Sequence, residues 1–357
     1  MRKANGSMRS VRSGVAGVLI ALLILAAGTA AVAFWAVSPV HAGAADKVTI
    51  DVKPGASVRQ VADDLARHGL IRGTLPFRIL ARLRGASVKV GEYELTAGMS
   101  ASAILGKLVR GEVITYPFTI PEGYTIRQIG DLLASKGFVE RAEWDRLVYD
   151  DSATFDDYAF LPAKAPSPGK GAPKGFRVSR LEGFLFPDTY QYARGMTAEQ
   201  IIRMLLNQFK AKFTAEMQQQ AAARGMSIQQ VVTLASIVER EAQVDAERPI
   251  IAGVFANRLR IGMRLESCAT VNFLLERPRD ILSLKDLETD SPYNTYRNGG
   301  LPPGPIANPG LASLQAALAP ADTDYLFFAS KFDGTHAFAK TLAEHNRNVA
   351  MFETWRK

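Results

Sequence analysis

A run of 23 uncharged residues near the N-terminus constrains this chain more than any other feature. It covers residues 15–37, VAGVLIALLILAAGTAAVAFWAV, and carries Trp35 close to its end. A helix of about 20 apolar residues spans the hydrocarbon layer of a bilayer, and tryptophan is common where such a helix leaves it. The run therefore predicts one transmembrane helix, with the rest of the chain folded outside the bilayer.

The charges before this run predict its orientation. Residues 1–14 contain no acidic residue and four basic ones, which are Arg2, Lys3, Arg9 and Arg12. Basic flanks of a membrane helix stay in the cytoplasm, so we expect a cytoplasmic N-terminus and an extracytoplasmic chain beyond residue 37. These four charges are half of the formal net charge of +8. The remaining excess is small for the length of chain that carries it, so we predict no nucleic-acid partner.

Two other interpretations of the apolar run remain open. Val40-His41-Ala42 resembles a signal-peptidase site, but a cleaved signal has an apolar core of about 7–15 residues, shorter than this one. A buried helix of a soluble protein is the other alternative. Since no later segment is comparably apolar, we favour an uncleaved, single-pass anchor in the cytoplasmic (inner) membrane.

Cysteine and histidine usage argues against a metal centre. Cys268 is the only cysteine among 357 residues, which excludes an intramolecular disulfide and a multi-cysteine zinc site. No helical ligand pair is formed by the four histidines, His41, His68, His336 and His345. The glycine-rich segments match neither a Walker nor a dinucleotide fingerprint, so the sequence predicts no cofactor.

An internal repeat follows the anchor. SVRQVADDLARHGLI (57–71) aligns without a gap with TIRQIGDLLASKGFV (125–139), and strand-like residues 48–52 and 118–120 precede the two copies. A Ser or Thr at the start of each copy predicts a helix N-cap. A unit of strand, turn and helix looks like the LysM modules that hold the glycan strands of peptidoglycan. The alternative is a duplicated packing unit without a ligand.

Composition shifts divide the exported part. We predict a LysM-like module over 47–115, a second repeat unit over 116–160 that links to the next domain, a flexible Pro/Gly/Lys loop over 161–175, and an α+β catalytic domain over 176–357. In the last domain, apolar periodicity predicts three helices and a buried strand. These cover residues 198–216, 227–243, 246–260 and 325–329. The Pro/Gly/Asn-rich stretch 290–310 predicts an irregular, functional loop.

A helix over 231–241 carries the strongest chemical signal. It is apolar up to Val238 and then presents Glu239 and Glu241. At about 100° per residue, Glu241 shares a face with bulky apolar side chains, whereas Glu239 lies over smaller ones. Burial favours the protonated carboxyl that a general acid needs, so we predict Glu241 as the better acid. Alternatively, both glutamates mark a solvated helix end and pair with Arg240 or Arg248.

Other catalytic arrangements have less support. Ser236 lacks a GxSxG context, and a lone thiol such as Cys268 is more often buried filler than a nucleophile. A glycosidase needs a second carboxylate as nucleophile or base. The sequence offers five unranked candidates for it, namely Glu182, Asp188, Glu247, Glu266 and Asp290.

Six ordered motifs carry a family resemblance that begins near residue 47 and continues to the C-terminus. They are LEGFLFPDTY (181–190), ASIVEREA (235–242), FANRLRIGMRLES (255–267), SPYNTY (291–296), GLPPGPIANPG (300–310) and HNRNV (345–349). Together they resemble the endolytic murein transglycosylase family, also called MltG or YceG-like.

The resemblance implies a reaction. The family cleaves the β-1,4 bond between N-acetylmuramic acid and N-acetylglucosamine inside peptidoglycan strands and leaves 1,6-anhydro-muramyl ends. The second acid of its IVExE segment, here Glu241, is the catalytic residue. One carboxylate suffices because the C6 hydroxyl of the substrate is the nucleophile, and no cofactor is needed. The enzyme would cut nascent strands at the membrane, beside peptidoglycan synthases.

Supporting residues also follow from the resemblance. The implied substrate-binding positions are Glu182, Tyr190, Glu239, Asn294 and Tyr296. Many relatives have Asp-Pro-Thr where this chain has Cys268-Ala269-Thr270, so any role of that aspartate is lost or displaced here. Two other functions stay open, a non-catalytic peptidoglycan-binding scaffold and a hydrolytic muramidase.

Overall fold

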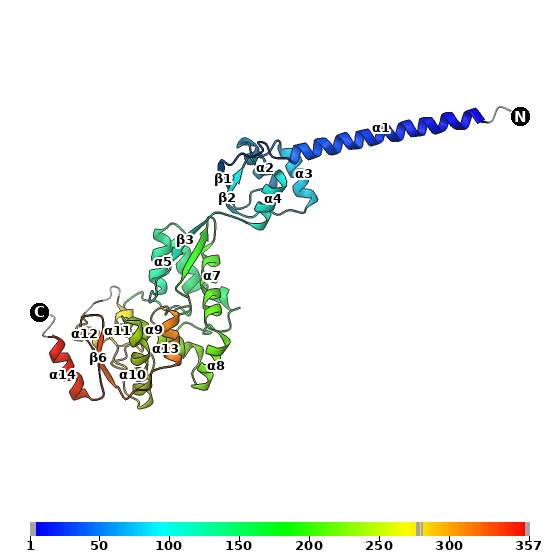
Figure 1. Ribbon diagram of the computed structural model, residues 1–357. Helices are drawn as coiled ribbons and strands as arrows, with labels where there is room; N and C mark the ends of the chain where they lie inside the picture. Colours follow the sequence, from blue (N-terminus) through cyan, green and yellow to red (C-terminus); the bar gives the residue numbers. More distant parts are fainter. Residues whose placement is uncertain (1–4, 276–278, 280, 354–357) are drawn as a thin grey trace. The chain divides into compact units, whose positions relative to one another are not determined.

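The computed structural model describes residues 5–275, 279 and 281–353, and these form two compact units. Unit 1 runs to Tyr116 and includes Ala193–Gly195, and unit 2 consists of Pro117–Tyr192 and the chain from Met196 onward. Each unit has its own apolar core. Helices and two-stranded sheets occur together, which confirms the α+β class (Figure 1).

The first helix, α1 (Asn5–Val37), contains the apolar run. Within it, Leu19–Val37 has a mean hydropathy of 2.3 and none of it is buried in the protein. In the described part of the chain, this is the helical segment that is long and apolar enough to cross a bilayer. The observation is compatible with the predicted single-pass anchor.

The rest of unit 1 is built around the first repeat. Its elements are β1 (Lys47–Val52), α2 (Val58–Arg67), α3 (Thr74–Leu83), β2 (Gly91–Thr96) and α4 (Ala101–Arg110). The two strands are antiparallel, with Lys47 opposite Thr96. Ser57 is the N-cap of α2, as the sequence predicts, and it forms a capping box with Gln60. Helix α3 was not predicted, although it lies between the repeat helix and β2.

The second repeat has the same order of elements. They are β3 (Thr115–Thr119), α5 (Ile126–Ser135), α6 (Arg141–Asp145) and β4 (Thr189–Ala193), and β3 pairs with β4. A π-helical turn, Arg146–Asp150, a 3-10 turn, Ser152–Phe155, and the predicted loop separate α6 from β4. The duplication therefore extends beyond the aligned segment to a complete strand–helix–helix–strand unit.

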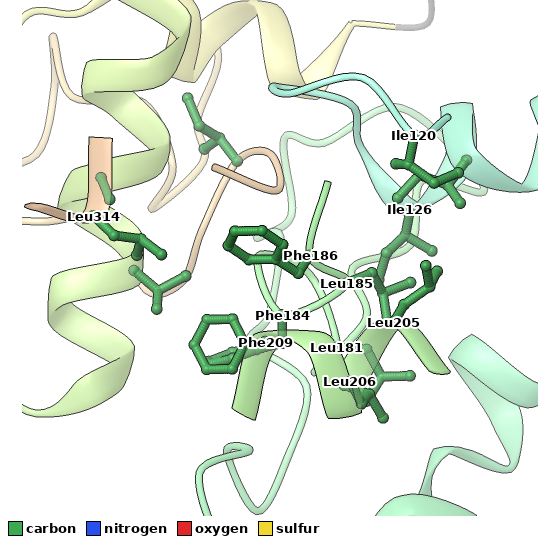
Figure 2. Close-up of a cluster of buried hydrophobic side chains, with 14 of the residues drawn as sticks. Ile120, Ile126, Leu181, Phe184, Leu185, Phe186, Leu205, Leu206, Phe209 and Leu314 are labelled. Carbon is green, nitrogen blue, oxygen red and sulfur yellow. The ribbon is translucent and has the colours of Figure 1, made fainter. Parts of the chain in front are cut away.

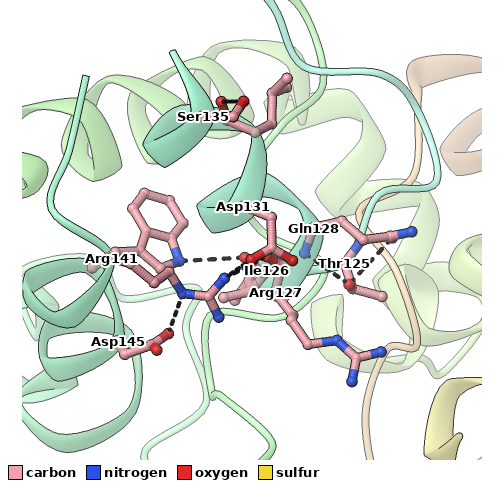
Figure 3. A network of polar contacts seen from close by, with 10 residues as sticks. Thr125, Ile126, Arg127, Gln128, Asp131, Ser135, Arg141 and Asp145 are labelled. Carbon is pink, nitrogen blue, oxygen red and sulfur yellow. Dashed lines mark hydrogen bonds and ion pairs between the residues drawn. The ribbon is translucent and has the colours of Figure 1, made fainter. Parts of the chain in front are cut away.

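Polar contacts lock the two helices of this second repeat together (Figure 3). Thr125 and Gln128 form the capping box of α5. Arg141 of α6 pairs with Asp131 of α5 and, at 3.1 Å, with Asp145 of its own helix. Arg141 also donates to the carbonyl oxygen of Arg127 in the first turn of α5 at 3.3 Å, and the N–H of Ile126 in the same turn donates to Glu182.

The remaining elements of unit 2 are mostly helical. They are α7 (Ala198–Lys212), α8 (Ala215–Ala223), α9 (Ile228–Glu241), a 3-10 turn (Asp245–Glu247), α10 (Arg248–Arg260), α11 (Cys268–Leu274), α12 (Leu284–Leu287), α13 (Leu311–Leu318), β5 (Phe327–Ser330), β6 (His336–Ala339) and α14 (Leu342–Glu353). Most of residues 290–310 lack regular structure, as predicted.

Three predicted boundaries differ from the structure. The predicted helix 198–216 is two helices, because Thr214 caps α8 after α7 has ended. The predicted helix 246–260 begins at Arg248, where a proline occupies the first turn. The predicted buried strand is β5, which is only half-buried because it lies in a two-stranded sheet.

The core of unit 2 joins the sequence motifs to the helices. Figure 2 shows Phe184, Phe186 and Leu185 of the 181–190 motif near Phe209, and Leu314 belongs to the same buried cluster. The Phe184 and Phe209 rings meet edge to face at 5.1 Å. Residues 184–186 of this motif therefore belong to the hydrophobic core, which also contains the buried residues of α9.

Candidate functional site

Helix α9 carries both glutamates of the predicted site. A capping box of Ser227 and Gln230 starts it, and every residue over 231–238 is buried. The helix ends at Glu241, which is half-buried. Its buried body fixes the axis of the helix, so the carboxylate at its end is held on a rigid support.

Glu241 is held by a hydroxyl group from a different part of the chain. The Oγ of Ser267 donates a hydrogen bond to Glu241 Oε1. The backbone N–H of Ser267 in turn donates to Thr295 Oγ1 at 3.0 Å, and that oxygen lies 2.9 Å from Thr270 Oγ1. Ser267, Thr270 and Thr295 are all buried. The carboxylate is thus oriented by a buried set of hydroxyl groups.

Tyr296 lies next to the residue that follows Ser267. Its hydroxyl is 3.0 Å from Cys268 Sγ, and Cys268 directly follows Ser267. Burial, the Cys268 contact and the charges of Glu241 and Glu266 raise the pKa of Tyr296 above its usual value. Its hydroxyl therefore stays protonated and available as a donor at neutral pH.

The turn that carries Ser267 is stabilised by hydrogen bonds from Arg258. Arg258 is buried and donates to the carbonyl oxygen of Leu265 at 2.8 Å and to that of Leu326 at 2.6 Å. Glu266 in this turn has φ 49°, which a residue other than glycine rarely adopts. Arg258 also lies 3.6 Å from the Glu266 carboxylate. The strained turn is thus stabilised by one multiply bonded guanidinium group.

Glu239, the other glutamate of α9, is bound by an arginine instead of a serine. Only 6% of its side chain is exposed, and it pairs with Arg248 at 3.0 Å. Its other oxygen accepts from the backbone N–H of Gly310 at 2.9 Å. Glu239 is thus a buried carboxylate whose charge is balanced by Arg248. The predicted alternative of pairing with Arg248 is confirmed for Glu239.

Glu182 is buried at a junction of three segments. Its carboxyl group accepts from the backbone N–H of Ile126 at 3.1 Å and from Asn308 Nδ2 at 3.1 Å. Burial raises its pKa to about 8, although these hydrogen bonds and the charge of Arg127 act in the opposite direction. It also borders a cavity of about 190 Å³. Sequence reasoning named Glu182 but missed Asn308, whose signal was its place in the 300–310 motif.

Two more predicted substrate-binding residues are enclosed within the protein. Tyr190 is buried and donates to the carbonyl oxygen of Phe186 at 2.5 Å. Asn294 is fully buried and donates to the carbonyl oxygens of Leu287 and Thr289 at 2.8 and 2.9 Å. The structure brings Tyr296, among the five predicted positions, next to the Glu241–Ser267 pair.

The candidate second carboxylates are also dispersed. Asp188 accepts from Gln208 at 2.6 Å, and Glu247 bonds His336 at 2.7 Å. Of the five candidate carboxylates, Glu266 is the one that directly precedes Ser267 in the chain. No group of three or more His, Cys, Asp or Glu side chains in the described residues has an arrangement that suits a metal ion.

The fold and the site define a class of protein, an α+β chain with an apolar N-terminal helix and a carboxylate at the end of a buried helix. Residues 50–351 match the model of the YceG-like family, and the chain belongs to this family. The family resemblance of the six motifs is thereby confirmed.

Relatives of known name extend this result. The chain is 35% identical over 319 residues to an endolytic murein transglycosylase of Bacillus subtilis (strain 168), covering 87% of this chain and 86% of the relative. It is 30% identical over 336 residues to one from Streptococcus pneumoniae serotype 2, of which it spans 59%. A solved yceG-like protein from Listeria monocytogenes aligns with a TM-score of 0.57 at 33% identity, over 84% of this chain and 98% of that one.

Proposed function

We propose that this chain is a membrane-anchored lytic transglycosylase of peptidoglycan that cuts inside glycan strands. The names of the Bacillus and Streptococcus relatives support the activity and the murein substrate. We assign the catalytic role to Glu241 because its carboxylate lies at the end of a buried helix and accepts a hydrogen bond from Ser267.

Glu241 acts first as acid and then as base on the bond between N-acetylmuramic acid and N-acetylglucosamine. It gives its proton to the glycosidic oxygen while the bond from that oxygen to muramyl C1 breaks. The C6 hydroxyl of the same sugar attacks C1 and closes the 1,6-anhydro ring. Its proton passes to the Glu241 carboxylate, so the acid form is restored and no water is consumed.

The neighbours of Glu241 suit this cycle. Ser267 fixes one carboxylate oxygen, which leaves the other free for the substrate. An intramolecular attack gains from proximity because its nucleophile is already attached to the reacting sugar. A single oriented carboxylate is then sufficient, and the dispersal of the other predicted carboxylates is consistent with a mechanism that uses no second one.

The location follows from α1. We place the N-terminus in the cytoplasm, α1 in the cytoplasmic membrane, and the rest of unit 1 together with unit 2 on the outer side of that membrane. Residues 47–115 are then a glycan-binding module, and synthases that polymerise glycan are the expected neighbours.

The Glu241→Gln variant tests the assignment. We expect glycan cleavage to fall by at least about a thousand-fold, since the amide neither donates nor takes up a proton. Purified sacculi are digested with the full-length protein, and the muropeptide ends are identified by mass spectrometry. Anhydro-muramyl ends support the lyase, whereas reducing ends would identify a muramidase and no new ends a scaffold.

The control is Glu216→Gln, which changes an exposed carboxylate on α8. It should retain cleavage, and both variants should melt near the wild-type temperature. Full activity in Glu241→Gln would reject the role assigned to this residue.

A further inference from the structure

Helix α3 exposes a row of large apolar side chains. Leu75, Ile79 and Leu83 are 62%, 50% and 81% exposed, although Phe77 and Ala81 of the same helix are fully buried in the unit 1 core. The three exposed residues are spaced by four, so they form one stripe along the helix. A stripe of this kind on an otherwise folded unit indicates a surface that is covered in the functioning protein.

This stripe continues onto the apolar surface of α1. Leu75, Ile79 and Leu83 line one wall of an open groove of about 870 Å³, and α1 lines the other with residues that include Ile24, Val32 and Phe34. The α1 residues belong to the segment that is apolar enough to span a bilayer. The groove is thus continuous with the surface that lipid would cover.

A contact near the end of α1 holds the two helices in this arrangement. Arg72, which precedes α3, donates to the carbonyl oxygens of Pro39 and Val40 at 2.8 and 3.3 Å. Its guanidinium group also lies over the Trp35 ring, 4.7 Å from the centroid. Tryptophan and arginine are residues that favour the interface between lipid and water. The contact therefore places the start of α3 next to the end of α1.

The charge around the stripe complements anionic lipid. Residues 65–91 contain no Asp or Glu but five Arg and one Lys. Arg78 and Arg82 line a second groove together with Leu75 and Ile79, and both are exposed. In the described part of the chain, neither arginine forms an ion pair with an acidic side chain. Two basic groups thus flank the apolar stripe without a protein partner for their charge.

We propose that α3 is a second membrane contact, lying in the outer surface of the bilayer that α1 crosses. Leu75, Ile79 and Leu83 enter the acyl region, and Arg78 and Arg82 bind lipid phosphate groups. An apolar face flanked by basic residues is typical of helices that lie in this interface. The inference rests on the proposed anchor. It adds that unit 1 is held against the membrane surface and does not swing freely from α1.

Environment-sensitive labels on the full-length chain test the proposal. In a Cys268→Ser background, a single cysteine is introduced as Leu83→Cys on α3, Leu25→Cys on α1 or Asp63→Cys on α2, and each is labelled with a nitrobenzoxadiazole dye. The protein is reconstituted into vesicles of phosphatidylcholine and phosphatidylglycerol. We expect the Leu83 label, like the Leu25 label, to be quenched by iodide about five-fold less than the exposed Asp63 label, and to be quenched by brominated lipid.

The outcomes separate the inference from the anchor. A Leu83 label as accessible to iodide as the Asp63 label, while the Leu25 label is shielded, overturns the α3 contact and leaves the anchor standing. If the Leu25 label is also accessible, both fail. Shielding of the Leu83 label that disappears when protein is diluted into more lipid would identify a second copy of the chain as the cover and would also overturn the proposal.

A charge-reversal variant tests the lipid contact in a second way. In Arg78→Glu/Arg82→Glu, we expect the Leu83 label to become more accessible to iodide in vesicles that contain phosphatidylglycerol, because the carboxylates repel the anionic surface. The control is Lys53→Glu, which changes an exposed basic residue outside both grooves and should leave the label shielded. Equal shielding in both variants would contradict the role of the two arginines.

Discussion

Ser267 is the residue on which the geometry of the candidate site depends. Sequence reasoning reached Glu241 but passed over Ser267, because the two lie on different elements and no local pattern joins them. A hydrogen bond to a charged group is worth roughly 1.5–3 kcal/mol. Its loss would release the carboxylate to other rotamers without unfolding the buried helix behind it.

The Ser267→Ala variant tests this positioning role. We expect kcat for glycan cleavage to fall about ten-fold with little change in KM, since the bond orients the carboxylate and does not touch the glycan. Steady-state release of anhydro-muropeptides measures both constants. Ser267→Thr keeps the hydroxyl and should recover most of kcat, whereas an equal loss in both variants would indicate a packing role only.

Glu182 is a buried carboxyl group whose proton contributes to folding. Burial raises its pKa from 4.5 to about 8. Between these two values, the folded chain keeps a proton that the unfolded chain has released. The contribution of Glu182 to stability is therefore present at low pH and is lost as the pH rises from about 4.5 through about 8.

The Glu182→Gln variant should remove this pH dependence. Glutamine keeps an oxygen that accepts from Ile126 and Asn308, and it has no proton to lose. We expect the free energy of unfolding of the variant to gain on the wild type as the pH rises from 5 to 8, by at most about 1.4 kcal/mol per pH unit. Thermal unfolding of both proteins across this range measures the gain. Asp188→Asn is the control, and parallel profiles for Glu182→Gln and wild type would contradict the prediction.

At the scale of elements, the two copies of the repeat form the same kind of helix start in two different units, at α2 and at α5. Both copies begin with the predicted N-cap residue, which forms a capping box with a glutamine only three positions further on. The copies differ where their surroundings differ. Gly130 of α5 corresponds to Ala62 of α2, and the glycine lies under the indole ring of the fully buried Trp144.

Gly130→Ala separates helix propensity from packing. Propensity alone would stabilise α5 by about 1 kcal/mol. The added Cβ, however, would lie 2.5 Å from Trp144 Cδ1, and overpacking a core costs about 1–3 kcal/mol. We therefore expect a lower melting temperature. The reciprocal Ala62→Gly variant should also lose about 1 kcal/mol, through propensity. A stabilised Gly130→Ala protein would show that the indole ring moves at little cost.

At the scale of the whole molecule, Arg248 joins parts of unit 2 that are distant in sequence. It pairs with Glu239 and donates to Ser313 Oγ at 2.5 Å, and Glu122 lies 3.8 Å away. From the sequence, Arg248 was expected only as an alternative ion-pair partner of Glu239 or Glu241. Its contacts instead tie α9, α10 and α13 to the loop before α5.

Removal of Arg248 should therefore be costly. In Arg248→Met, the Glu239 carboxylate stays buried without its counter-charge, and breaking a buried pair in this way costs about 3–5 kcal/mol. We expect the double variant Arg248→Met/Glu239→Gln to recover part of this loss, because the uncompensated charge is gone. Thermal unfolding of the two single variants and the double variant measures the coupling, and strictly additive losses would contradict it.

The apolar N-terminal helix, the repeat, the α+β class and the family motifs could all be predicted from the sequence. Each depends on residues close together in the chain, through apolar length, periodicity, caps or ordered motifs. The pairing of Glu239 with Arg248, the Ser267–Thr295 contact and the exposed apolar face of α3 were decided only by the tertiary structure. Desolvation and the choice of a polar partner depend on atoms that distant segments bring into contact, and helix periodicity carries no information about which segments those are.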